Sequence, residues 1–335
     1  MNTIALIIPD ARGMQCVNRE LLCRGDTPMK KIISPYARST LWMADVLRKV
    51  PADWTWPLSV AVGRLLYWTR SGRRREVLRA YKKLCEVAHL ERSAESLTKA
   101  FFDRQLMLMT ANYILQGMPP ERFEQLCDFD GLDGVREALS EGRGVIVTCF
   151  HIGTHLLSFA KLEREGYPLT TLRPAFMRDI SDPRLRRMLF IHNGAIYVGD
   201  STGLASPVRE VAKTLRKGYI VGIAPDGDQG GGLTDISVLG GNYPIRRGLV
   251  EIAKVARSPM VFAFGVVRNK KFYVKYDAPW FVRDGDDAGA VAEAFLQDCA
   301  RKFEEVILNY PECVWWTRPL CQALGLKSAS SASED

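Results

Sequence analysis

Residues 144–151 read Gly-Val-Ile-Val-Thr-Cys-Phe-His, and this stretch decides the fold class. It is apolar and rich in β-branched residues, a glycine-containing turn precedes it, and a histidine closes it. Such a run is typical of a strand that is buried on both faces of a sheet. The sequence therefore predicts a buried strand over residues 144–150, with His151 at its carboxyl end.

Beyond this strand, strand-like and helix-like patterns alternate. Further strands are expected over residues 169–172, 195–198, 219–224, 260–267 and 271–276. Helices are expected over residues 156–165, 183–193, 206–217, 248–256 and 287–309. This alternation predicts an α/β fold with a mainly parallel, mixed sheet and helices on both faces. Helical spacing over residues 73–116 predicts a helical segment before the sheet.

The chain is expected to divide into three parts. Residues 1–50 form an N-terminal extension, residues 51–325 the main domain, and residues 326–335 a disordered tail. A length of 335 residues with 47% hydrophobic content allows one large buried core. The tail is rich in serine and alanine and ends in Glu-Asp, which is typical of disorder.

Eight cysteines are spread along the chain without a Cys-x-x-Cys pair or a tight cluster with histidine. This spacing argues against a zinc site, and we expect no metal and no cofactor. Residues 1–9 contain an apolar run but lack the basic start and the cleavage site of a secretory signal. We therefore expect a cytoplasmic protein with reduced thiols.

The net charge is +8, and arginines gather at residues 73–75, 184–187 and 246–247. Such clusters attract anionic lipids, an acidic carrier protein or RNA, while a solvated basic face is an equal alternative for each cluster. The apolar stretch 56–68 is shorter than the ~20 residues that span a bilayer. Its aromatic ends predict either a helix at a membrane interface or a core helix. Any attachment to the inner face of the cytoplasmic membrane would be peripheral.

Charged side chains follow the predicted strands. His151 and Arg173 come directly after strands, and Asp226 follows one after a single proline. Catalytic groups of open α/β sheets gather at the carboxyl ends of strands, so we expect these side chains at one site. A histidine there can take a proton from a hydroxyl or an amine, although a lone histidine is more often structural.

The residues around His151 also carry a resemblance to a known family. Residues 142–153, Gly-Arg-Gly-Val-Ile-Val-Thr-Cys-Phe-His-Ile-Gly, resemble the first motif of the bacterial lipid A biosynthesis (lauroyl/myristoyl) acyltransferases, which belong to the lysophospholipid acyltransferase superfamily. Further blocks resemble the family in order: residues 129–139, 172–174, 186–194, 215–218, 226–229, 240–249 and 310–318. The resemblance covers about residues 55–320 and makes residues 51–325 an acyltransferase-like domain.

This resemblance implies a mechanism. A histidine acts as general base on an acceptor hydroxyl, which attacks an acyl thioester, and a carboxylate five residues later orients the imidazole. The second-block arginine, Arg173, and residues near Asp226 would hold phosphate or sugar groups. The family implies a lipid A precursor or a related glycolipid as the acceptor. The basic clusters suit an acidic acyl carrier protein or a coenzyme A thioester as the donor.

One position departs from the family motif. Leu156 stands five residues after His151, where the family has Asp or Glu, and His155 precedes it. Leucine cannot orient an imidazole by hydrogen bonding, so the usual partner of His151 is missing. Three explanations of this departure stay open. Asp226 or Asp228 orients His151 instead, or His155 and His151 act together on an amine or hydroxylamine. In the third, the fold persists without catalysis as a binding or regulatory protein.

Three further features each have two interpretations. The glycine-rich loop over residues 226–232 either approaches a bound group closely or is a flexible turn. Arg246 and Arg247 either bind anionic groups or form surface ion pairs. Cys149 shares a strand face with His151 and could act as a nucleophile, but we interpret it as inert packing.

We therefore predict an acyltransferase that uses a thioester donor and a lipid or small-molecule acceptor. The predicted catalytic residues are His151, His155, Asp226 and Asp228, and the predicted substrate-binding residues are Arg173, Gln229, Arg246 and Arg247. One alternative is a specialised-metabolite transferase that takes its acyl group from an aminoacyl-tRNA, for which the positive charge would also serve. Another is a non-catalytic protein of the same fold that binds a lipid or a carrier.

Overall fold

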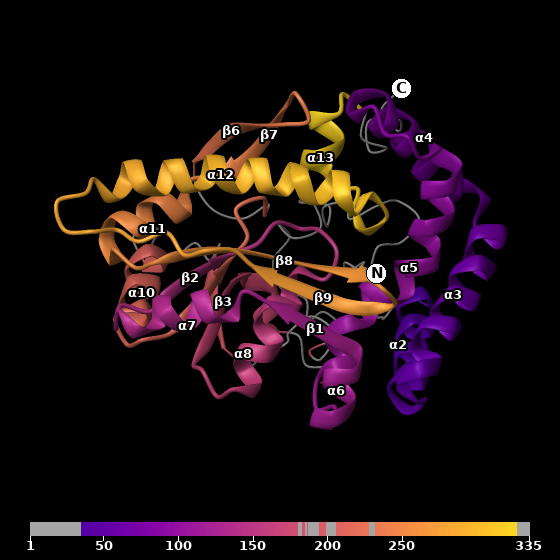
Figure 1. The fold of residues 1–335 in the computed structure, drawn as a ribbon, viewed down its shortest axis with the longest axis horizontal. Helices are drawn as coiled ribbons and strands as arrows, with labels where there is room; N and C mark the ends of the chain where they lie inside the picture. The colour runs from indigo at the N-terminus through magenta and orange to yellow at the C-terminus, as the bar shows by residue number, and fades with distance from the viewer. Residues whose placement is uncertain are drawn as a thin grey trace, which may run out of the picture.

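A computed structural model describes residues 35–179, 194–198, 206–227 and 232–326, with Pro183, Arg184 and Arg186 as isolated positions. Its centre is a seven-stranded sheet (Figure 1). In spatial order the strands are β1 (Cys127–Asp130), β9 (Lys271–Tyr276), β8 (Met260–Arg268), β2 (Val145–Thr148), β5 (Ile220–Ile223), β3 (Leu169–Pro174) and β4 (Ala195–Val198). β8 and β9 pair antiparallel, and the other neighbouring pairs are parallel. The predicted mainly parallel, mixed sheet is confirmed.

Helices lie on both faces of this sheet, as predicted. They are α6 (Pro120–Leu126), α7 (Leu132–Ser140), α8 (Ala160–Arg164), α10 (Ser206–Leu215), α11 (Gly248–Ala256) and α12 (Ala288–Asn309). The last helix, α13 (Arg318–Ala323), packs mainly against residues 241–246 instead. In Figure 1, α12 runs above the sheet, while α7 and α8 lie below it. The strand β2 is completely buried because its apolar run lies between β8 and β5 in the interior of the sheet.

In the described part of the chain, four helices of 15 or more residues precede the sheet and confirm the predicted N-terminal helical segment. They are α2 (Pro35–Lys49), α3 (Ala52–Thr69), α4 (Ser71–Ala88) and α5 (Ala94–Leu115), and they stand together at the right of Figure 1. The other three helices of this layer all contact α5. Ser93 caps the start of α5, and its hydroxyl accepts a hydrogen bond from the N–H of Ser96. Most residues of α5 are buried.

Several elements differ from the expectation. The strand β1 and the antiparallel hairpin of β6 (Leu233–Val238) and β7 (Gly241–Arg246) were not predicted. Their polar residues hide the strand pattern, since only part of each strand is buried. The helix predicted over 156–165 is a 3₁₀ helix, η1 (His155–Phe159), followed by the short α8. Most of the helix predicted over 183–193, and the tail beyond Leu326, lie outside the described residues.

The turn after β2 is fixed by backbone contacts with distant segments. Gly153 has a φ of +54°, and a Cβ added there would lie 2.1 Å from the carbonyl oxygen of Gly265 on β8. The position therefore requires glycine. The N–H of Gly153 donates to the carbonyl of Cys313 at 2.9 Å, and its carbonyl accepts the indole N–H of Trp315 at 2.6 Å. Thus β8 and residues 311–315 together determine where His151 stands.

Candidate active site

His151 lies just beyond the carboxyl end of β2, in the middle of the sheet. The preceding Phe150 is fully buried and stacks on Phe303 of α12, with ring centroids 4.6 Å apart. This anchor fixes the backbone, while the His151 side chain remains 28% exposed. The imidazole is thus held from one side and open to solvent on another.

Asp226 contacts His151 twice. Its Oδ1 lies 2.8 Å from Nδ1 of His151, and its Oδ2 accepts the backbone N–H of His151 at 2.8 Å. The Tyr243 hydroxyl on β7 donates to the same Oδ2 at 2.9 Å. Because the Asp226 side chain is completely buried, these contacts hold it in one orientation. The carboxylate that Leu156 cannot supply therefore comes from the turn after β5, the strand beside β2.

Electrostatics keeps Asp226 ionised. Burial by itself would raise the pKa of this carboxyl, but the charge of His151 and the hydrogen bonds from His151 and Tyr243 outweigh it. The net result is a pKa below the ordinary value of an aspartate. At neutral pH an anionic carboxylate therefore faces Nδ1, which favours the tautomer with its proton on Nδ1 and leaves Nε2 to accept one.

His155 lies next to His151. The two rings meet edge to face, with centroids 4.8 Å apart. The Nδ1 atom of His155 is shielded from solvent and has no hydrogen-bond partner among the described residues. Burial, followed by the nearby charge of His151, lowers the pKa of His155 well below its usual value. His155 is thus a neutral imidazole that can hydrogen-bond to a ligand.

Arg173 is the last residue but one of β3, at the same edge of the sheet. β3 neighbours β5, so His151, Asp226 and Arg173 come from three adjacent strands. The Nε of Arg173 donates to the hydroxyl of Thr171 at 3.0 Å. Burial lowers the pKa of Arg173 to about 10, so the guanidinium is still charged at neutral pH. Its charge also contributes to the low pKa of His155, which shows that the two groups share one electrostatic environment.

The structure places the other predicted site residues in different surroundings. The backbone N–H of Arg246 donates to the Pro225 carbonyl at 2.7 Å, and its Nε to the Gly227 carbonyl at 3.3 Å, so Arg246 braces the turn that carries Asp226. Arg247 forms an exposed ion pair with Glu293 at 2.6 Å. Asp228 and Gln229 lie outside the described residues.

Tyr243 is the site residue that the sequence analysis missed. It is fully buried on β7, and its only sequence signal is its place in the block over residues 240–249. Nothing in that block pairs position 243 with position 226, because the contact depends on how the hairpin folds over the turn. Cys149, by contrast, is a buried thiol whose pKa burial raises to about 12, so it is protonated at neutral pH.

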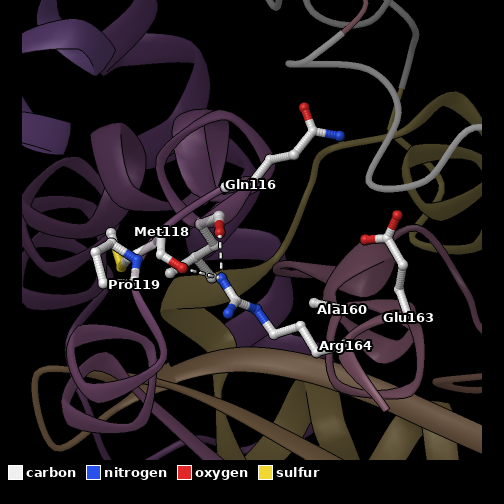
Figure 2. A pocket seen from close by; sticks show the side chains of 8 residues that line it. Gln116, Met118, Pro119, Ala160, Glu163 and Arg164 are labelled. Atoms are coloured by element: carbon white, nitrogen blue, oxygen red, sulfur yellow. Dashed lines mark hydrogen bonds between the residues drawn. The ribbon is translucent and has the colours of Figure 1, made fainter. Parts of the chain in front are cut away.

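One hollow in the described part of the chain lies away from His151. A pocket of about 340 Å³ is lined by residues from the end of α5 and from α8, including Gln116, Glu163 and Arg164 (Figure 2). Arg164 donates to the carbonyls of Leu115 and Met118 at 3.1 and 2.7 Å, so its guanidinium stabilises the backbone at the end of α5. His151 does not line this pocket, and the candidate catalytic side chains lie at the edge of the sheet instead.

The described residues contain no group of three or more His, Cys, Asp or Glu side chains arranged to hold a metal ion. No helix among them is both long and apolar enough to cross a bilayer. Among known proteins, the family described as bacterial lipid A biosynthesis acyltransferase matches residues 32–320 of this chain. A search of curated proteins found no match.

Proposed function

The chain belongs to the bacterial lipid A biosynthesis acyltransferase family, and we propose that it transfers an acyl group from a thioester to a hydroxyl or amine acceptor at His151. The observation that carries this proposal is the pair formed by His151 and Asp226, whose side chains lie 2.8 Å apart. A buried carboxylate on Nδ1 is the arrangement that makes an imidazole an effective general base.

In the proposed reaction, Nε2 of His151 takes the proton of the acceptor as its oxygen or nitrogen attacks the thioester carbonyl carbon. Asp226 stabilises the imidazolium that forms. When the tetrahedral intermediate collapses, the carbon–sulfur bond breaks and the imidazolium returns the proton to the departing thiolate. Tyr243 is a positioning residue, because its hydroxyl donates to the carboxylate of Asp226 and acts on His151 through that carboxylate.

The negative charge of the tetrahedral intermediate requires a hydrogen-bond donor. The backbone N–H groups of residues 151–154 are already bonded, to Asp226, Phe150, Cys313 and Gly265 respectively. We assign this role to Arg173, whose guanidinium remains charged at the end of β3. The neutral ring of His155 would hydrogen-bond to the bound acceptor.

An acyl carrier protein or coenzyme A is the proposed donor, and a lipid the proposed acceptor, because both suit the family and the positive net charge. The proposed location is the cytoplasm, at the inner face of the cytoplasmic membrane. An aminoacyl-tRNA donor remains a second proposal that rests on charge alone. Binding of such a donor would weaken steeply with added salt, and insensitivity to salt would remove this proposal.

The test measures thiol release from acyl-carrier and acyl-coenzyme A donors with lipid and amine acceptors. His151→Ala and Asp226→Asn should each lower kcat by about 10² to 10⁴. Leu156→Glu is the matched control, and we expect no gain from it because Asp226 already occupies Nδ1.

Two outcomes would contradict the proposal. An Asp226→Asn enzyme with the wild-type rate would exclude the pair from the mechanism. If the wild-type protein releases no thiol from any donor, and the His151→Ala variant binds those donors unchanged, the chain is a binding protein of the same fold.

A further inference from the structure

Three large apolar side chains of helix α3 lie on the outside of the protein. Trp54, Leu65 and Trp68 are 63%, 62% and 73% exposed. Pro57 and Ala61, also exposed, lie between them. The five positions are separated by three, four, four and three residues, so they form a single stripe along the helix. A continuous exposed stripe of this kind marks a binding surface.

The side of α3 that packs on α5 has small and polar residues at its most buried positions, with partly buried apolar side chains such as Leu66 and Tyr67 beside them. Thr55, Ser59 and Gly63 are its buried residues, four positions apart. A Cβ added to Gly63 would lie 2.1 Å from the carbonyl oxygen of Phe102, so α3 and α5 are in backbone contact there. α3 thus buries only small and polar side chains completely and exposes two tryptophans and a leucine, unlike a typical surface helix, which keeps its large apolar residues on the inner face. Helices that face lipid use small residues for helix packing and direct large apolar residues outward.

Cationic and aromatic groups border the stripe. The guanidinium of Arg74 lies over the rings of Tyr67 and Trp68, at 5.0 and 5.8 Å from their centroids. Arg75 is exposed at the start of α4. Trp54 and Trp68 stand near the two ends of α3, and tryptophan is enriched at the boundary between lipid and water.

We propose that the outer face of α3, formed by Trp54, Leu65 and Trp68, binds an anionic lipid bilayer by lying in its interfacial layer. The apolar side chains enter the layer to a depth of about 5–10 Å, and Arg74 and Arg75 meet the phosphate groups. A second copy of the chain fits less well. A two-fold pairing of these faces would bring the same arginines of both copies together. This surface is independent of the catalytic proposal.

The test is co-sedimentation of the full chain with vesicles of phosphatidylcholine alone or with added phosphatidylglycerol. We expect binding that increases with the anionic lipid and weakens with salt. Leu65→Ser and Trp68→Ser should each lower the partition coefficient by about tenfold. Leu233→Ser is the matched control, because Leu233 is 61% exposed but lies on β6. Arg75→Gln should reduce the preference for the anionic lipid.

Three results would overturn the proposal. The first is no binding to either vesicle, and the second is an equal loss of binding in Leu233→Ser and Leu65→Ser. The third is a concentration-dependent dimer in sedimentation that Leu65→Ser abolishes, which would assign the face to a second copy. Leu65 lies outside the proposed catalytic site, so thiol release from a water-soluble donor should be unchanged in Leu65→Ser. The membrane-binding proposal and the catalytic proposal can therefore fail independently of each other.

Discussion

Asp226 and His151 are 75 residues apart in the chain, yet their side chains lie 2.8 Å apart. The family motif places the carboxylate five residues after the histidine, where this chain has Leu156. In this chain Asp226, on the turn after the neighbouring strand, contacts Nδ1 instead, and an imidazole requires only an acceptor at that atom. The loss of a motif residue therefore does not by itself indicate the loss of the chemistry.

His155 should make stability depend on pH. In the unfolded chain a histidine takes up a proton below about pH 6.5, but burial keeps this ring neutral in the folded protein. Its contribution is therefore complete above about pH 6.5 and is lost as the pH falls toward the lower folded pKa. His155→Gln should flatten the fall in unfolding free energy below pH 6.5 by up to about 1 kcal/mol per pH unit.

Urea denaturation at a series of pH values measures this effect. His89→Asn is the control, because His89 is exposed and has a positive φ that asparagine tolerates. Equal slopes for the wild type and His155→Gln would show that the ring of His155 is not kept neutral by burial.

At the scale of elements, the contact between α3 and α5 depends on Gly63. Gly63→Ala would place a methyl group against the backbone of Phe102, so the helices must separate. We expect a loss of about 1–3 kcal/mol, although alanine is the better helix former. The free energy of unfolding in urea provides the measurement.

Gly72→Ala is the control for this prediction, since a Cβ at Gly72 meets nothing within 4 Å in α4. That change should be neutral or stabilise the protein by up to about 1 kcal/mol. If Gly63→Ala were equally benign, α3 would not be packed on α5 at this distance.

At the scale of the whole molecule, Glu312 ties the N-terminal helices to the C-terminal segment. Its buried carboxylate pairs with Arg92 at 2.8 Å and with Arg104 at 3.1 Å, and Arg104 is only 20% exposed. The Tyr81 hydroxyl donates to the neighbouring carbonyl of Pro311 at 2.8 Å. The Pro-Glu of the terminal block thus joins α4 and α5 to the segment that also fixes the His151 turn.

Glu312→Gln should lower stability by about 1–3 kcal/mol, because it leaves Arg104 partly buried without its counter-charge. A double-mutant cycle with Arg104→Gln should show coupling. Glu305→Gln, which breaks the exposed pair with Arg301, should cost less than about 1 kcal/mol. Additivity of the Glu312 and Arg104 changes would contradict the proposed link.

Much of the fold was predictable because its signals are local. The apolar run before His151 predicts a buried strand. The alternation of strand-like and helix-like patterns along the chain predicts a mainly parallel sheet. The hairpin of β6 and β7 was missed, since polar residues on its open face hide the strand period. The 3₁₀ turn at His155 was missed because contacts from other segments shape it, such as the Tyr276 hydroxyl that donates to the Ser158 carbonyl at 2.5 Å.

The sequence by itself determined the strand, the position of His151 at its end, and the absence of the usual carboxylate at Leu156. It left open which group faces the imidazole. Only the tertiary structure decided that, because parallel pairing sets Thr148 on β2 against Ile223 on β5 and so brings Asp226 beside His151. The periodicity of apolar and polar residues depends only on neighbours in the sequence, whereas the register between strands depends on the packing of the whole sheet.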